Sequence, residues 1–191
     1  MANVDNPHGF RAVRAQGAGY YTGGGNIYAV AAGDAQVIAA GDPVVKTGTS
    51  TAEGVPIVTQ ATAGTANALT GIMVARTNGD GTLLQDDTRN TVASTLQWIL
   101  VEDNPNIVFE AQVTAAFAIT DIGSNGNIVV GTSTLDGKSI CEVNSTGFAT
   151  TAAHQVKVLR LYRAVDNIVG TNARVEVLFN NHTEANGTAG I

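Results

Sequence analysis

The chain is poor in cysteine, in charged residues and in aromatic residues. One cysteine, Cys141, occurs among 191 residues, which excludes both an intrachain disulfide framework and a cysteine-based zinc site. Charged residues make up 14% of the chain, well below the roughly 25% usual in soluble domains, and aromatic residues only 5%. Because the chain also holds 22 glycines, the composition favours many short strands and turns over a thick helical core.

Long apolar runs and an excess of positive charge are also missing. No apolar stretch approaches the roughly 18 residues of a transmembrane helix, and the first residues hold no apolar segment typical of a signal peptide. We therefore expect neither a membrane span nor secretion. The net charge is -6, whereas proteins that coat nucleic acid or an anionic membrane need a basic surface. The sequence predicts no nucleic-acid partner and no membrane partner.

Composition divides the chain into three regions. Residues 1–25 contain six glycines and form a predicted extended N-terminal arm. Residues 26–180 form a predicted all-β domain, most of which is acidic, since residues 26–154 hold twelve acidic residues against four basic ones. Residues 181–191 form a C-terminal tail.

The predicted arm has two interpretations. Its glycines are costly to order, which is typical of a flexible leader. Its apolar side chains favour the second interpretation, an arm that becomes ordered against a neighbouring subunit or another protein. These side chains are Phe10, Val13, Tyr20 and Tyr21.

Short apolar or alternating stretches recur between residues 26 and 180 at roughly 10- to 15-residue spacing. Turn residues bound nearly all of them, which predicts an all-β sandwich or barrel of short antiparallel strands. The expected strands cover residues 27–30, 37–40, 44–46, 55–59, 69–75, 95–102, 107–112, 127–130, 155–162 and 173–179.

Some details of these elements can also be predicted. Trp98 shares one face of its strand with Leu96 and Leu100, and we expect it in the core. Helical structure has two weak candidates, residues 114–119 and residues 88–95, neither with a sustained helical period.

No combination of residues indicates catalysis. A catalytic triad needs a serine, a histidine and an acid that converge, and none of the histidines accompanies a G-x-S-x-G motif. They are His8, His154 and His182. Cys141 lies in a strand-like segment and is expected to be a small buried residue rather than a nucleophile. The sequence therefore predicts that the protein is not an enzyme.

Metal and cofactor sites are equally poorly supported. Asn78, Asp80, Gly81 and Asp87 match four positions of a calcium-binding loop, but the first position is Arg76, which cannot ligate a cation. A looser cluster of Asp80, Asp86 and Asp87 is the remaining alternative to an exposed acidic loop. Residues 17–23 are rich in glycine but have the wrong spacing for a dinucleotide site. We expect no metal and no cofactor.

Five motifs, in order along the chain, resemble the head decoration (cement) proteins of tailed bacteriophages. The N-terminal motif resembles the family's P-x-G-[FL]-[RK]-P-V-R, with Ala12 where proline is common. The others resemble its GDPV turn, its DDP…FEIQ stretch, its DIGxNA turn and its closing DN…NA…N-x-H pattern. The five motifs cover residues 6–14, 40–48, 101–112, 121–127 and 159–182.

The resemblance implies a structural protein of the virion, made in the host cytoplasm and bound to the outer capsid surface. It implies a β-sandwich or β-tulip-like barrel, a homotrimer or less commonly a dimer, and the major capsid protein as partner. Such proteins hold neighbouring capsid subunits together against the pressure of packaged DNA. By this resemblance we expect the arm to contact the capsid through Phe10, Arg11, Val13 and Arg14.

One other function stays open from the sequence. A β module of a phage tail or head fibre would bind the host surface, and it would need an aromatic patch for its ligand. The aromatic residues available for such a patch are Tyr28, Trp98 and Tyr162.

Overall fold

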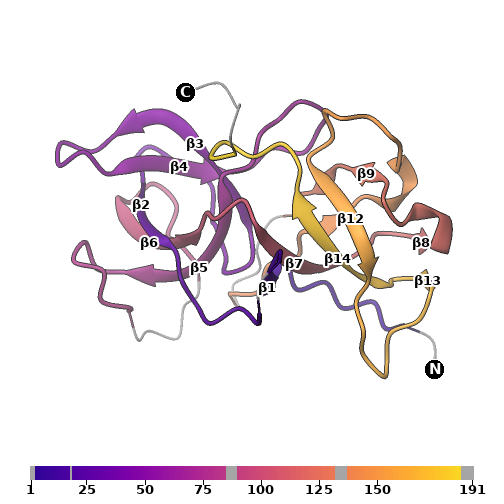
Figure 1. The fold of residues 1–191 in the computed structure, drawn as a ribbon. Coiled ribbons are helices and arrows are strands. Elements are labelled where there is room, and N and C mark those ends of the chain that lie inside the picture. Colours follow the sequence, from indigo (N-terminus) through magenta and orange to yellow (C-terminus); the bar gives the residue numbers. More distant parts are fainter. Residues whose placement is uncertain (1–2, 18, 85–89, 132–136, 186–191) are drawn as a thin grey trace.

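The computed structural model describes residues 3–17, 19–84, 90–131 and 137–185, and within them the protein is all-β, as predicted (Figure 1). Most strand pairs are antiparallel, and two short 3-10 turns are the only helical elements in the described residues. The strands form two units that lie side by side, a closed barrel and a five-stranded sheet.

The barrel is built from one contiguous part of the chain. Its order is β2-β4-β3-β5-β6, with β2 parallel to β4 and the other pairs antiparallel. Pro56 begins a strand, as expected of a residue that cannot donate a ladder hydrogen bond. The strands are β2 (Asn26–Val30), β3 (Pro43–Ser50), β4 (Pro56–Gln60), β5 (Gly71–Thr77) and β6 (Gln97–Glu102).

Side chains of β6 alternate between its two faces, and Ile99 and Val101 belong to the barrel core, where both are fully buried. The predicted core position of Trp98 is wrong, because this residue lies on the outer face of β6, half-buried against Gly79. Both faces of β6 are apolar, so the period of two identifies the residues that share a face but not the face that points inward.

The five-stranded sheet combines strands from both ends of the sequence. Its order is β1-β7-β14-β12-β9, so the barrel is inserted between the first two of these strands. The strands are β1 (Arg11–Ala15), β7 (Ile107–Gln112), β9 (Asn125–Gly126), β12 (Val156–Leu161) and β14 (Arg174–Phe179).

The inner face of the sheet forms the larger core. Val175, Val177 and Phe179 of β14 point inward, as predicted. Phe179 stacks on Phe109 of β7 at a centroid distance of 4.6 Å, and Phe10 meets it edge-on at 5.6 Å. The aromatic cluster therefore joins the N-terminal segment to the last strand.

Smaller elements complete the sheet unit. β8 pairs with β13 and β10 pairs with β11, each in a two-stranded sheet. The helix considered for residues 114–119 is not formed, because β8 and the start of a 3-10 turn occupy this segment. For residues 88–95, the described part, from Asn90, is not helical. The elements are β8 (Ala116–Phe117), η1 (Ile119–Asp121), β10 (Ile128–Val129), β11 (Glu142–Val143), η2 (Ser145–Gly147) and β13 (Gly170–Thr171).

One expected strand is not formed, and part of the tail is bonded to the rest of the chain. Residues 37–40 form isolated bridges through Ala39 and Ala40 instead of a strand. The described part of the tail bonds to the segment between β4 and β5, since the Leu69 N–H donates to the Asn181 carbonyl at 2.8 Å and the Thr183 N–H donates to the Leu69 carbonyl at 2.9 Å.

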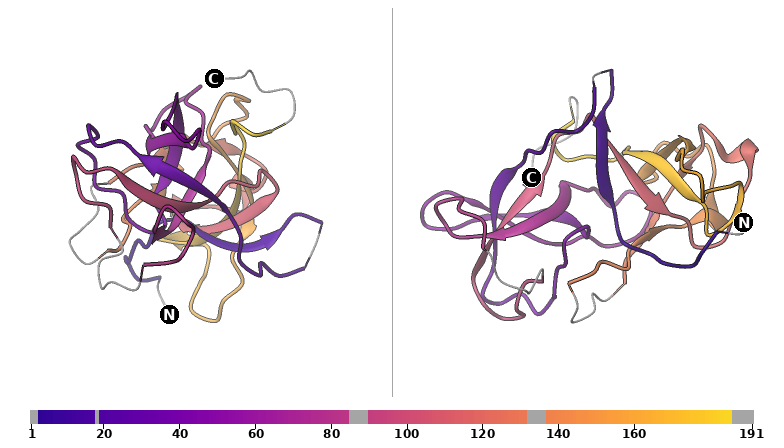
Figure 2. Two further views of the ribbon diagram at one scale, coloured as in Figure 1. Left: turned by 90° about the vertical axis from the view of Figure 1, so that its left-hand side faces the viewer. Right: turned by 90° about the horizontal axis from the view of Figure 1, so that it is seen from below.

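The N-terminal segment is extended, as predicted, and lies along its own chain (Figure 2). Residues 3–10 run beside the sheet unit, and β1 then pairs antiparallel with β7. Within the expected arm of residues 1–25, the chain therefore supplies an edge strand of the sheet. The glycines did not prevent this, because most of them lie after the strand.

Candidate interaction surface

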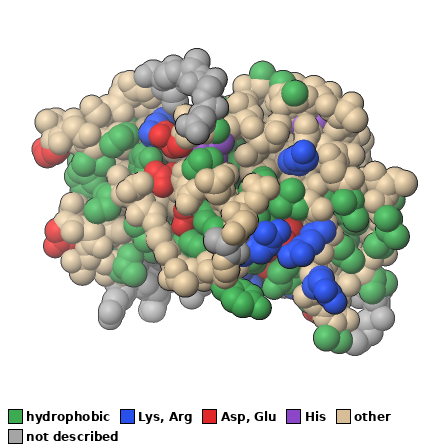
Figure 3. Space-filling model, viewed as in Figure 1, with side chains coloured by type: hydrophobic (Ala, Val, Ile, Leu, Met, Phe, Trp, Pro, Cys, Tyr) green, Lys and Arg blue, Asp and Glu red, His purple; other side chains and the backbone are tan. Residues whose placement is uncertain are grey.

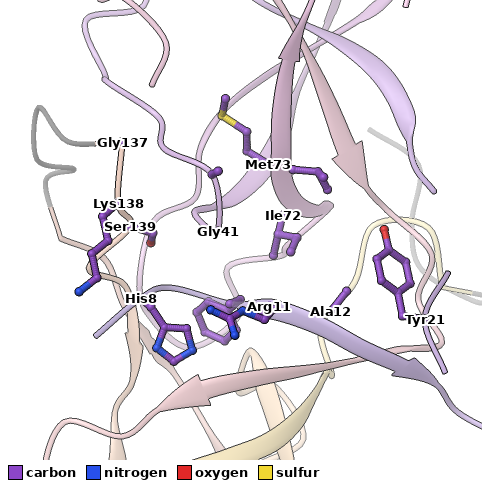
Figure 4. Close-up of a pocket in the computed structure, with 13 residues that line it drawn as sticks. His8, Arg11, Ala12, Tyr21, Gly41, Ile72, Met73, Gly137, Lys138 and Ser139 are labelled. Carbon is purple, nitrogen blue, oxygen red and sulfur yellow. The ribbon is translucent and has the colours of Figure 1, made fainter. Parts of the chain in front are cut away.

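A groove lies between β1 and the barrel. It encloses about 470 Å³ and has an apolar wall from β5, where Ile72, Met73 and Val74 line it. Figure 4 shows Ile72 facing β1 across the groove, with Tyr21 at one end and His8 and Lys138 at the other. The groove therefore combines an apolar wall with a basic end.

Three nitrogen-containing side chains form the basic end. His8, Arg11 and Lys138 line both this groove and an adjoining cavity of about 370 Å³. Lys138 donates to the amide oxygen of Asn6. Arg11 is exposed, and no carboxylate of the described residues forms an ion pair with it. Its guanidinium is therefore available to an external carboxylate.

Burial sets the protonation of His8. Desolvation lowers the pKa of His8 and outweighs the opposing attraction of Glu110, whose Oε1 lies 3.8 Å from His8 Nε2. The positive charge of Arg11 lowers this pKa further. We therefore assign the fixed positive charge of this end to Arg11 and Lys138.

The extended residues before β1 are held by side-chain hydrogen bonds. The Asn3 amide donates to the carbonyls of Ile168 and Thr171, both at 2.8 Å. Gln112 accepts from the Asn6 N–H at 3.1 Å, and the Phe10 N–H donates to the Gly41 carbonyl at 2.9 Å. These bonds fix the segment before its strand begins.

The four predicted contact residues have different environments. Phe10 is 2% exposed in the core, and Val13 lies half-buried at the bulge where its carbonyl accepts from the Tyr21 N–H. Arg11 faces the groove. Arg14 forms an ion pair with Glu176 at 2.8 Å. Of these four residues, only Arg11 combines an exposed side chain with a charge that has no ion-pair partner in the described residues.

Charges on the outer face of the sheet form a network. Glu110 and Glu176 are register partners across β7 and β14, and both are nearly fully buried. Arg14 and Arg160 both contact Glu176 at 2.8 Å, and Arg174 contacts Glu110 at 3.2 Å. Two carboxylates that would otherwise repel each other are therefore each neutralised by arginine.

The three histidines do not converge with a nucleophile. His154 Nδ1 lies 3.2 Å from the Asn125 carbonyl, and His182 accepts from the Glu184 N–H at 3.0 Å. His8 lies in the groove. These separate local contacts give no catalytic arrangement among the three.

No metal-binding cluster occurs among residues 3–17, 19–84, 90–131 and 137–185, where no three His, Cys, Asp or Glu side chains gather. Asp80 accepts from the Thr82 N–H at 2.9 Å, which lowers the pKa of the Asp80 carboxyl. The other acids of that predicted loop, Asp86 and Asp87, lie outside the described residues.

Cys141 is fully buried, as predicted, and its thiol donates to Asp42 at 3.3 Å. Burial raises the pKa of Cys141 to about 12, with a further contribution from the charge of Asp42. Since the thiolate is the reactive form, we expect Ellman's reagent at about pH 8 to leave the native protein unmodified. One thiol per chain should react in guanidinium chloride, and rapid reaction without denaturant would contradict this burial.

The aromatic residues considered for a ligand patch lie in different environments. Tyr28 is 4% exposed and lies in the barrel core, where its hydroxyl donates to Asp103 at 2.7 Å. Trp98 packs on Gly79, and the Tyr162 ring lies 5.5 Å from the Arg174 guanidinium in the sheet unit. We find no shared aromatic surface formed by the three.

Comparison with known proteins adds no identification. Searches of protein-family models, of curated proteins and of solved structures found no match to this chain. In the described part of the chain, no helix has the length and hydropathy needed to cross a membrane.

Proposed function

We propose that this protein is a head decoration protein, which binds the outer surface of a bacteriophage capsid and holds neighbouring major capsid protein subunits together. The proposal includes assembly as a homotrimer and excludes an enzymatic role. Five sequence motifs in family order support it, and they extend from the N-terminal segment to the last strand.

The observation that carries the proposal is the position of Arg11. It belongs to the N-terminal motif, it is exposed, and it lies at the basic end of a groove with an apolar wall. An extended segment of a capsid subunit that carries a carboxylate beside an apolar side chain matches this groove in charge and polarity.

The proposed mechanism is attachment at several points. A specific protein contact usually buries on the order of 1,000 Å² or more. In a closed trimer, the first contact makes the second and third intramolecular, so contacts of modest affinity add up to durable binding. Capsid subunits joined in this way resist separation under internal pressure.

Co-sedimentation with DNA-free heads that lack the protein tests this proposal. We expect the wild-type protein to pellet with the heads and the double variant R11E/K138E to bind about tenfold or more weakly, because two cations of the groove become anions. Point substitutions are preferable to removal of residues 1–20, since that deletion also removes Phe10 from the core and β1 from the sheet.

A control variant separates this local effect from a general change of charge. Ala52→Glu adds a negative charge at the exposed turn between β3 and β4, away from the groove. We expect it to bind like the wild type. A folded wild-type protein that does not pellet with the heads, or a double variant that binds normally, would refute the proposal.

A further inference from the structure

Basic side chains gather on the outer face of the sheet over β12 and β14 (Figure 3). We call four of them the basic strip, namely Arg14, Lys157, Arg160 and Arg163. Lys157 and Arg160 are register partners of Leu178 and Glu176, which share one face of β14. Lys157, Arg160 and Arg14 therefore lie on the face opposite the aromatic core, and Arg163 follows two residues after the end of β12.

The basic strip carries an excess of positive charge. Arg14 and Arg160 share one carboxylate, that of Glu176. Lys157 and Arg163 are exposed, and neither forms an ion pair with a described residue. With Arg174 included, five cations on this side of the sheet therefore exceed its three carboxylates, Glu110, Asp166 and Glu176, in a chain whose net charge is -6. Such local segregation attracts an acidic partner and orients it as it approaches.

Aliphatic side chains are exposed next to this charge. Val165 is two residues beyond Arg163 and is 100% exposed, and we call it, with its exposed neighbours, the aliphatic tip. Val4 joins the tip because the Asn3 side chain bonds to the backbone of Ile168. Its four members are Val4, Val165, Ile168 and Val169.

The loop that carries the tip is held in place. Asn167 is 7% exposed, and its amide donates to the carbonyls of Tyr162 at 2.6 Å and Arg174 at 2.8 Å. It also accepts from the Arg174 N–H at 2.8 Å. Full exposure of Val165 is therefore a feature of a fixed loop, and a preorganised surface loses less entropy when it binds.

We propose that the basic strip and the aliphatic tip form one docking surface for a protein partner whose contact site has an apolar pocket bordered by carboxylates. Val165 enters the pocket, and Lys157, Arg160 and Arg163 pair with its border. An apolar centre with a charged rim is the usual arrangement of a protein interface.

The surface favours a protein over two other partners. The phosphates of a nucleic acid would pair with the cations but offer no pocket for four aliphatic side chains. In addition, the chain as a whole is acidic, which disfavours binding to nucleic acid. A second copy that presented the same strip would place like charges face to face. An apolar pocket bordered by carboxylates on a different protein would bind both the aliphatic tip and the basic strip.

The identity of the partner rests on the proposed function. A protein that holds two capsid subunits together needs two contact surfaces. No residue of the strip or the tip lines the groove of Arg11, and of these residues Val4 lines the adjoining cavity. A second capsid subunit is therefore the partner that we assign to the docking surface. The binding chemistry itself can be tested without the capsid.

The first experiment uses chemical probes in place of the capsid. A random glutamate–tyrosine copolymer presents carboxylates with apolar rings, polyglutamate presents carboxylates alone, and single-stranded DNA presents phosphates. We expect tightest binding to the copolymer, with an affinity that falls as salt is added. K157E/R163E should weaken it about tenfold or more, and Val165→Asp should lower copolymer affinity to that of polyglutamate.

Two matched variants control for unfolding and for general charge. Val92→Asp places a carboxylate on another exposed aliphatic residue, in the barrel unit, where the side chain is 55% exposed. Ala52→Glu again adds negative charge away from the strip. Both should bind the copolymer like the wild type, and all variants should keep the wild-type unfolding midpoint within a few degrees.

The second experiment repeats the comparison with DNA-free heads. Loss of head binding in K157E/R163E supports the assigned partner, whereas normal head binding in this variant overturns it. If the wild type does not bind heads, the proposed function fails, and the copolymer result still decides the docking surface. Three results would overturn the inference of a different protein partner. The first is binding to DNA as tight as to the copolymer or tighter, and the second is unchanged copolymer binding in the variants. The third is salt-dependent self-association that K157E/R163E abolishes.

Discussion

Replacement of Phe10 by alanine should lower the free energy of unfolding by about 3–5 kcal/mol, the usual loss for a buried phenylalanine. Phe10 is 2% exposed and packs edge-on against Phe179. The preceding residue, Gly9, has a φ of 72°, and a Cβ there would lie 2.6 Å from the Gly41 carbonyl oxygen. The backbone therefore positions this ring, and denaturant unfolding measures its contribution.

Tyr20→Ala is the matched control for this variant. It removes an aromatic ring from the same N-terminal segment, but Tyr20 is 91% exposed, so its loss should change the free energy of unfolding by less than about 0.5 kcal/mol. Equal effects of the two substitutions would show that the N-terminal segment is not anchored in the core as the structure has it.

Acid should destabilise the protein through His182, which is buried beside the Phe179 ring. Burial lowers the pKa of His182 to about 4 from 6.5, although Glu184 and Asp103 oppose this and Lys46 adds to it. Between these pH values the unfolded chain binds a proton that the folded chain does not. The contribution of His182 to the free energy of unfolding is thus fully present above pH 6.5 and is lost as the pH falls toward 4. At pH 5 the loss is about 2 kcal/mol.

Unfolding by denaturant at pH 7.5 and at pH 5 measures this loss. His182→Asn keeps an acceptor for the Glu184 N–H, so it should be less sensitive to acid than the wild type by that amount. Leu69→Val reduces packing at the residue bridged to His182 without removing a titrating group, and should keep the wild-type dependence on pH. The same loss in His182→Asn and the wild type would exclude His182 as its source.

Strand positions were predictable because apolar alternation and turn residues are local signals. Residues 107–112 and 173–179 illustrate this, since β7 and β14 lie within them. Residues 37–40 are also apolar, but Ala39 and Ala40 form only isolated bridges, with Asn90 and Lys138. Whether an apolar stretch becomes a strand depends on a partner that is distant in sequence.

The role of the N-terminal segment was only partly predictable. The sequence indicated that it is extended and that its apolar side chains pack against something. It did not indicate that the chain itself supplies that surface, because the partner strand β7 is separated from β1 by the whole barrel. The ion pair of Arg14 with Glu176 joins residues 162 positions apart.

The basic strip was not identified from the sequence. Arg14 lies near one end of the sequence, and Lys157, Arg160 and Arg163 lie near the other. The fold brings these ends together in one sheet, because β1 and β12 flank the paired strands β7 and β14. A charge pattern that depends on strand order becomes visible only when the order is known.

Insertion of the barrel between β1 and β7 determines when each unit can form during translation. All barrel strands have been synthesised by Glu102, so this unit can close while the ribosome is still elongating the chain. β1 must wait for its partner β7, and the aromatic core must wait for β14, which at typical elongation rates is synthesised on the order of 10 to 30 seconds after β1. During that interval Phe10 has no aromatic partner from the last strand, and a chain that ends before Arg174 lacks both β14 and the Glu176 carboxylate that Arg14 and Arg160 share.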